Sequence, residues 1–133
     1  VTKVKHCIVT HRFRQNNPPQ SLEAKILFDA DKIDATGTLG IARTLFYKGN
    51  VGEPLYSLLF DGRVSDRTGD SKPSFFQEYK YKLEKLSSRF YTARGNEIAK
   101  ERRKTAVSFY EDMKREVSDS YDKGMDLLNK IIR

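Results

Sequence analysis

Three aspartates within six positions of an otherwise apolar stretch are the residues of this chain best suited to chemistry. Asp29, Asp31 and Asp34 lie in residues 27–37, whose apolar side chains recur at helical spacing. On a helix Asp31 and Asp34 share one face, because residues three apart are neighbours, and Asp29 points roughly the other way. Carboxylates in an apolar helical face cost free energy unless they are paired or bind a cation. The stretch is therefore either a metal-ligating helix or a helix end with solvated acids.

Basic side chains accompany these carboxylates. Arg12 and Arg14 flank an aromatic residue in a segment whose Asn and Pro residues predict a loop. Their guanidinium groups are either phosphate ligands or solvated charges. Lys32 adjoins Asp31, as a phosphate contact or a local counter-charge. We expect Arg43 to reach back towards the carboxylates, pair with an aspartate and hold its orientation.

Helices are the elements that must position these residues. The first covers residues 1–11, and the second runs from an N-cap at Ser21 to about residue 35. The second helix carries the aspartates near its C-terminal end, where the helix dipole disfavours anions and a bound divalent cation would offset that cost. A third helix over residues 38–48, which ends at a left-handed Gly49-Asn50, is expected to face inward through four apolar residues: Leu39, Ala42, Leu45 and Phe46.

The second half of the chain is predicted to begin with a long surface loop over residues 50–73, with one helical turn at 55–59. Two helices follow, over residues 75–91 with Ser74 as the cap and over residues 92–121. Beyond them a short amphipathic tail could dock on the domain or on a partner subunit, which makes a homodimer possible. The fold class that this pattern predicts is all-α, without a significant sheet.

Composition bounds the class of protein. Charged residues make up 32% and hydrophobic residues 38%, which suits a globular protein, and we expect residues 1–133 to form a single helical domain. No apolar run approaches the length of a membrane span and no signal-peptide pattern opens the chain, so no membrane partner is expected. The single Cys7 excludes an internal disulfide and fits a cytoplasmic location, and two histidines with one thiol exclude a zinc finger.

The net charge of +7 is spread along the chain. Such a diffuse excess attracts phosphate-bearing ligands. It lacks the clustering of Lys and Arg that nucleic-acid binding requires, and Lys and Glu interleave through the C-terminal half. We therefore expect a solvated basic surface and no nucleic-acid partner.

The ordered string Asp29-Ala30-Asp31-Lys32-Ile33-Asp34-Ala35, followed by Gly37 and Gly40-Ile41-Ala42-Arg43, closely resembles a known motif. It is similar to the last motif of HD-domain metal-dependent phosphohydrolases, and most of all to the small stand-alone branch that hydrolyses nucleotides and related phosphate esters. The resemblance covers residues 4–50 well and residues 75–110 more loosely, where Phe76 and Lys82-Leu83 look like a family pair that packs against the metal-site helices. It implies an HD-domain-like helical bundle.

The resemblance also implies a set of site residues. The aspartate that follows Ala in this motif closes the family's metal site, and the matching position is Asp31. His11 could by resemblance be a second metal ligand or a phosphate contact, and a surface or capping histidine is the alternative. Five further residues are candidates for binding or orienting phosphate: Arg12, Arg14, Lys32, Asp34 and Arg43.

The chain departs from the family in its histidines. The family takes one histidine and then a His-Asp pair from helices that precede this motif, whereas this sequence has only His6 and His11 and no His-Asp dipeptide. We expect those ligands in residues upstream of this sequence, which would make it the C-terminal part of an HD domain. The expected function is hydrolysis of a nucleotide or another small phosphate ester by a water that a divalent cation such as Mn, Fe or Mg activates. The alternative is a catalytically inactive HD-like module that binds a ligand or a protein.

Overall fold

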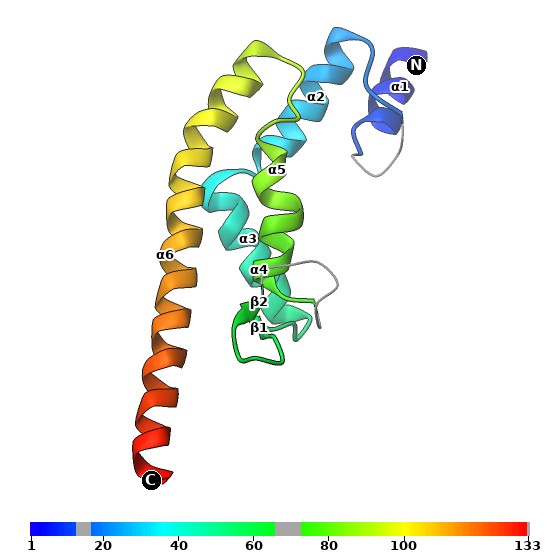
Figure 1. Ribbon diagram of the computed structural model, residues 1–133. Coiled ribbons are helices and arrows are strands. Elements are labelled where there is room, and N and C mark those ends of the chain that lie inside the picture. The colour runs from blue at the N-terminus through cyan, green and yellow to red at the C-terminus, as the bar shows by residue number, and fades with distance from the viewer. Residues whose placement is uncertain (13–16, 66–72, 133) are drawn as a thin grey trace.

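The protein is a helical bundle in the computed structural model, which describes residues 1–12, 17–65 and 73–132 (Figure 1). This confirms the predicted all-α fold. None of the described helices is both long and apolar enough to cross a bilayer. The elements in chain order are α1 (Thr2–Thr10), α2 (Leu22–Ile33), α3 (Gly37–Asn50), β1 (Ser57–Leu58), β2 (Val64–Ser65), α4 (Phe75–Glu78), the π-helix η1 (Tyr79–Leu83), α5 (Glu84–Leu86) and α6 (Ala93–Ile132).

The long helix α6 runs along one side of the molecule, packs against α2 and α3, and extends past the β-hairpin at its C-terminal end (Figure 1). Helix α1 packs on α2 at the opposite end, and η1 with α4 packs on α3. The arrangement brings the end of α2, the start of α3 and the η1–α5 segment together.

Two serine caps set helix starts where the sequence predicts them. The Ser21 hydroxyl accepts a hydrogen bond from the Ala24 N–H at 3.2 Å at the start of α2. The Ser74 hydroxyl does the same for the Gln77 N–H at 3.3 Å at the start of α4. Each bond satisfies a backbone donor that the first helical turn leaves free.

The inward face predicted for α3 is wrong except at Leu45. Three of the four residues expected to face inward are exposed: Leu39, Ala42 and Phe46. The helix instead turns Ile41, the partly buried Leu45 and Lys48 towards the core, at spacings of four and three. Lys48 is buried because its ammonium group pairs with the carboxylates of Glu53 and Glu78.

The segment after α3 is more structured than the long loop that the sequence predicts. Helix α3 continues through Asn50, and the left-handed residue is Gly52 (φ 71°), so the predicted left-handed end at Gly49-Asn50 is wrong. The predicted helical turn at 55–59 is also wrong, because β1 lies there and pairs antiparallel with β2. Residues 66–72 of the predicted loop lie outside the described part of the chain.

The last two helices differ from the prediction at their ends. The predicted helix over 75–91 ends at Leu86 and contains the π-helical turn η1. Helix α6 continues to Ile132, so the tail predicted as a separate short element is its last part. Its apolar side chains are exposed in this single chain, and the homodimer that they suggest stays a prediction.

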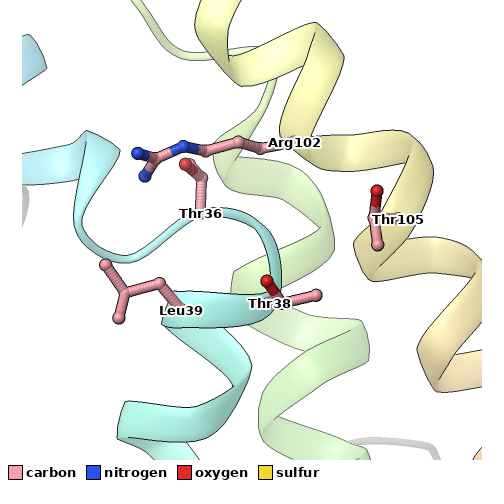
Figure 2. Close-up of a pocket in the computed structure, with 5 residues that line it drawn as sticks. All are labelled: Thr36, Thr38, Leu39, Arg102 and Thr105. Carbon is pink, nitrogen blue, oxygen red and sulfur yellow. The ribbon is translucent and has the colours of Figure 1, made fainter.

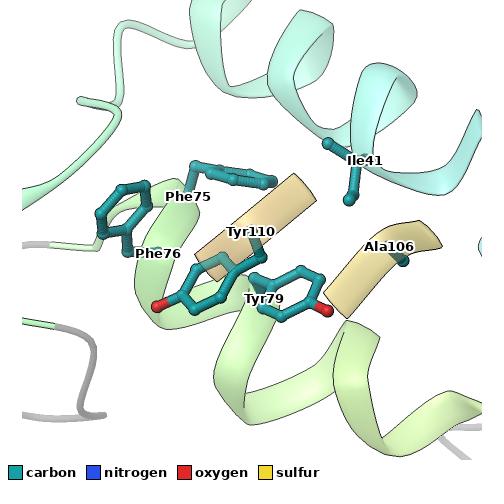
Figure 3. Close-up of a cluster of buried hydrophobic side chains, with 6 residues drawn as sticks. All are labelled: Ile41, Phe75, Phe76, Tyr79, Ala106 and Tyr110. Carbon is teal, nitrogen blue, oxygen red and sulfur yellow. The ribbon is translucent and has the colours of Figure 1, made fainter. Parts of the chain in front are cut away.

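Aromatic rings form the centre of the core (Figure 3). The ring of Tyr79 stacks on that of Tyr110 with centroids 4.1 Å apart, and Phe76 meets Tyr110 edge to face at 5.2 Å. Burial raises the pKa of Tyr79 to about 12. The full cluster joins α3, α4, η1 and α6 through six residues: Ile41, Phe75, Phe76, Tyr79, Ala106 and Tyr110.

Gly40→Ala should destabilise the protein, because a Cβ at Gly40 would collide with the backbone carbonyl of Ala35 in the turn between α2 and α3. We expect a loss of about 1–3 kcal/mol in the free energy of unfolding, measured by urea denaturation. Gly49→Ala is the matched control, since a Cβ there meets nothing within 4 Å and Ala favours a helix over Gly. Equal changes in the free energy of unfolding for the two variants would contradict the close approach of Gly40 to the Ala35 carbonyl.

Candidate functional site

One cleft collects most of the predicted site residues. It has a volume of about 410 Å³ and lies where the end of α1, the C-terminal part of α2, helix α3 and the η1–α5 segment meet. Five of the seven predicted residues line it, together with Ala35, Lys82 and Leu86. The five are His11, Arg12, Asp31, Lys32 and Arg43. Of the other two, Arg14 lies outside the described residues and Asp34 lies beside the cleft.

The charge of the cleft is positive. Four cationic side chains line it, Arg12, Lys32, Arg43 and Lys82, against the single carboxylate of Asp31. A concave surface with such an excess raises the local concentration of anions. Guanidinium and ammonium groups are also the usual partners of phosphate oxygens. The arrangement suits a ligand that carries phosphate.

Asp31 is the carboxylate that lines the cleft, with 50% of its side chain exposed. Its Oδ2 lies 2.6 Å from Nζ of Lys32. The Lys32 stem is largely buried, its Nζ lies 5.0 Å from the centre of the Phe28 ring, and it donates to the His11 carbonyl at 3.4 Å. Lys32 therefore acts as the counter-charge of Asp31 and also ties the end of α1 to α2.

His11 closes α1 as its C-cap residue, as the capping interpretation has it. Its Nδ1 lies within hydrogen-bonding distance of the Ile8 carbonyl. A carbonyl only accepts, so in this contact Nδ1 is the donor, and Nε2 is the ring nitrogen that the contact does not use. Capping thus leaves free the nitrogen that a metal ion or a phosphate proton would use.

Arg43 reaches back to the aspartates, as predicted, and its partner is Asp34. Its Nη1 lies 3.5 Å from the Asp34 carboxylate and donates to the Asp34 carbonyl at 3.4 Å. Both side chains are exposed, so the ion pair is worth about 0.2–1 kcal/mol. Arg43 thus pairs weakly with Asp34 and leaves Asp31 to its contact with Lys32.

Asp29 has a structural task instead. Its side chain points away from the cleft, is 3% exposed, and accepts hydrogen bonds from the backbone N–H of Tyr91 (2.9 Å) and of Thr92 (2.7 Å). The Thr92 hydroxyl donates to it as well, at 2.6 Å, and accepts from the Gly95 N–H at 3.0 Å. Asp29 therefore binds the N-terminus of α6 to α2, where the helix dipole favours a negative charge.

Two side chains of the cleft are of types that could ligate a metal ion. Within residues 1–12, 17–65 and 73–132, no three His, Cys, Asp or Glu side chains come together as a metal site requires. The cleft offers one hard oxygen ligand in Asp31 and one imidazole in His11. A catalytic centre commonly uses three protein ligands and keeps an open position for water. These two donors fit a divalent cation only with further ligands.

A second, smaller cavity contains none of the predicted residues (Figure 2). It has a volume of about 200 Å³, and Arg102 extends from α6 across the turn between α2 and α3. Its guanidinium group donates to the Ile33 carbonyl at 2.7 Å, which joins α2 to α6. With no carboxylate or imidazole in its lining of Thr36, Thr38, Leu39, Arg102 and Thr105, this cavity offers a metal ion no good ligand.

Comparison with solved structures identifies the fold as HD-like. An HD-superfamily hydrolase from Bacillus thuringiensis is 30% identical in sequence and superposes with a TM-score of 0.58, over 72% of this chain and 46% of that one. No family model matches the chain. The architecture is thus an all-α bundle of the kind found in an HD-superfamily hydrolase.

A curated relative is YpgQ of Bacillus subtilis strain 168, which is described as an uncharacterized protein. The sequence identity is 29% over an alignment of 119 residues, and the match covers 86% of this chain and 52% of YpgQ. The crystal structure of YpgQ in complex with ADP is 27% identical, covers 86% of this chain and 51% of that one, and gives a TM-score of 0.67. The chain therefore spans about half the length of this curated relative.

Lys82 is the cleft residue whose position sequence reasoning missed. The resemblance marks Lys82-Leu83 only as a packing pair, and Lys82 instead adds a cation to the cleft. Its distance along the sequence from residues 11–43 hides this placement. The alternation of Lys with apolar residues in Tyr79–Leu83 was the local feature that could have indicated a cation at a cleft wall.

Proposed function

We propose that the protein is a metal-dependent phosphohydrolase that acts on nucleotides or related small phosphate esters. One observation carries this proposal: five of the predicted residues line one positively charged cleft, with the Asp31 carboxylate half exposed to solvent. Two comparisons support it. The fold is shared with an HD-superfamily hydrolase, and YpgQ, which has the same fold, has been crystallised with ADP.

Each residue has a distinct task in this proposal. Asp31 is a hard oxygen ligand of the ion, and Nε2 of His11 is a second ligand or a phosphate contact. Arg12, Lys32 and Arg43 hold phosphate oxygens and keep the ester oriented in the cleft. When bound, a divalent cation such as Mn²⁺, Fe²⁺ or Mg²⁺ polarises a phosphoryl oxygen and supplies an activated water. The remaining ligands, a histidine and a His-Asp pair, would come from residues upstream of this sequence.

A specific observation also favours a second function, an HD-like module that binds a ligand without turnover. Within the described residues no three His, Cys, Asp or Glu side chains come together, and the cleft lining contains only Asp31 and His11 of these types. Such a module would retain the positive cleft and bind phosphate-bearing ligands through it. The two functions differ in whether phosphate is released.

The test is a phosphate-release assay on the full-length natural protein, across nucleotides and simple phosphate esters, with Mn²⁺, Fe²⁺ or Mg²⁺. We expect release that requires the cation and stops when a chelator removes it. Binding of ADP with no release from any of these compounds would contradict the hydrolase and leave the binding module.

A further inference from the structure

We propose that Lys82 binds phosphate oxygens of the substrate, from a wall of the cleft that the HD-like motif does not supply. This inference rests on the proposed function. Arg12, Lys32 and Arg43 come from the first 43 residues, whereas Lys82 and Leu86 come from the η1–α5 segment. A phosphate group in the cleft would therefore meet cations from two separate parts of the chain.

Lys82 lies within the π-helical turn η1. In an uninterrupted α-helix Phe75, Tyr79, Lys82 and Leu86 would follow one another along one face, at spacings of four, three and four. A π-helical turn takes in one extra residue and shifts the side chains that follow. Tyr79 and Leu86 remain buried while the Lys82 side chain is 47% exposed and lines the cleft. Single π-helical turns inside helices occur frequently at functional sites.

The present partner of Lys82 is one that a phosphate could replace. Its Nζ lies 2.8 Å from Oε1 of Glu78, in a pair that is partly exposed and therefore weak. Glu78 also lies 3.8 Å from Nζ of Lys48, which has a closer partner in Glu53. Exchange of Glu78 for a phosphate oxygen would leave no buried carboxylate unpaired, because Glu78 keeps Lys48. The doubly charged phosphate is the stronger acceptor.

The test compares Lys82→Met with Lys85→Met in the full-length protein. Lys85 is exposed on the same helical segment, its Nζ lies 5.1 Å from the centre of the Tyr81 ring, and it does not line the cleft. We expect Lys82→Met to weaken ADP binding, measured by calorimetric titration, by roughly tenfold, and to leave binding of adenosine unchanged. Lys85→Met should leave both affinities unchanged, and Glu78→Gln should keep or raise the affinity for ADP. Thermal melts establish that each variant is folded.

The outcomes separate this inference from the proposed function. If the natural protein releases phosphate and Lys82→Met binds ADP with unchanged affinity, the role of Lys82 is overturned and the hydrolase stands. If no phosphate is released but Lys82→Met still weakens ADP binding, the hydrolase is overturned and the phosphate contact stands. Equal weakening by Lys85→Met, or a natural protein that binds neither ADP nor pyrophosphate, overturns the role of Lys82.

Discussion

Asp29→Ala is expected to lower the free energy of unfolding by about 3–5 kcal/mol, enough to unfold much of the protein. The substitution removes the acceptor of three hydrogen bonds and leaves the N–H groups of Tyr91 and Thr92 without their partner at the start of α6. It also removes the negative charge from the positive end of that helix dipole. Chemical denaturation followed by circular dichroism measures the loss.

Two variants control this prediction. Asp29→Asn keeps one carbonyl acceptor. Its free energy of unfolding should therefore lie between those of the natural protein and of Asp29→Ala. Asp31→Ala changes a half-exposed side chain and should cost less than about 0.5 kcal/mol. If Asp29→Ala proved as stable as Asp31→Ala, Asp29 would not be the residue that binds α6 to α2.

Asp31→Ala should abolish metal-stimulated phosphate release and leave the helical content nearly intact. We expect the rate to fall by more than about a hundredfold. Removal of a group that only orients a metal ligand already lowers metal affinity or activity by about 10–100-fold. The measurement is release of phosphate at saturating Mn²⁺, with a circular dichroism spectrum of each variant.

Asp34→Ala is the matched control for Asp31→Ala. Asp34 lies on the same helical face and pairs with Arg43, so its loss should lower the rate only modestly, by roughly fivefold or less. Asp29→Asn, where it folds, should retain most of the activity. Equal loss of activity in folded Asp29 and Asp31 variants would show that Asp31 is the wrong ligand.

Local signals explain what the sequence predicted of the fold. Helical period and serine caps act over one or two turns, so the starts of α2 and α4 were predicted correctly at Ser21 and Ser74. Helix α3 has apolar residues on several faces, from Leu39 to Tyr47, so its sequence does not select the buried side. Which face of α3 is buried depends on the residues of α4 and α6 that pack against it.

Long-range partners explain what the sequence did not predict. The spacing showed that Asp29 points away from Asp31, and its partners Tyr91 and Thr92 follow 62 and 63 residues later. Nothing local in residues 27–37 distinguishes a carboxylate that holds another helix from one that faces a ligand. The π-helical turn η1 likewise packs against elements distant in sequence, against α3 and through Tyr79 on Tyr110 of α6.

Short-range sequence order explains why several predicted residues line one cleft. Asp31, Lys32 and Arg43 lie on two consecutive helices, so one short motif brings them to the same end of the bundle. The position of His11 follows from the contact between α1 and α2, which the sequence does not encode locally. The tasks of these residues in binding a metal ion or phosphate stay predictions.

The most direct test of the central proposal is the metal content of the full-length natural protein after exposure to Mn²⁺ and removal of loosely bound ions. The proposal predicts a stoichiometric ion in the natural protein and loss of that ion in Asp31→Ala, whose fold is kept. A natural protein without bound metal, or equal metal content in Asp31→Ala, would contradict it.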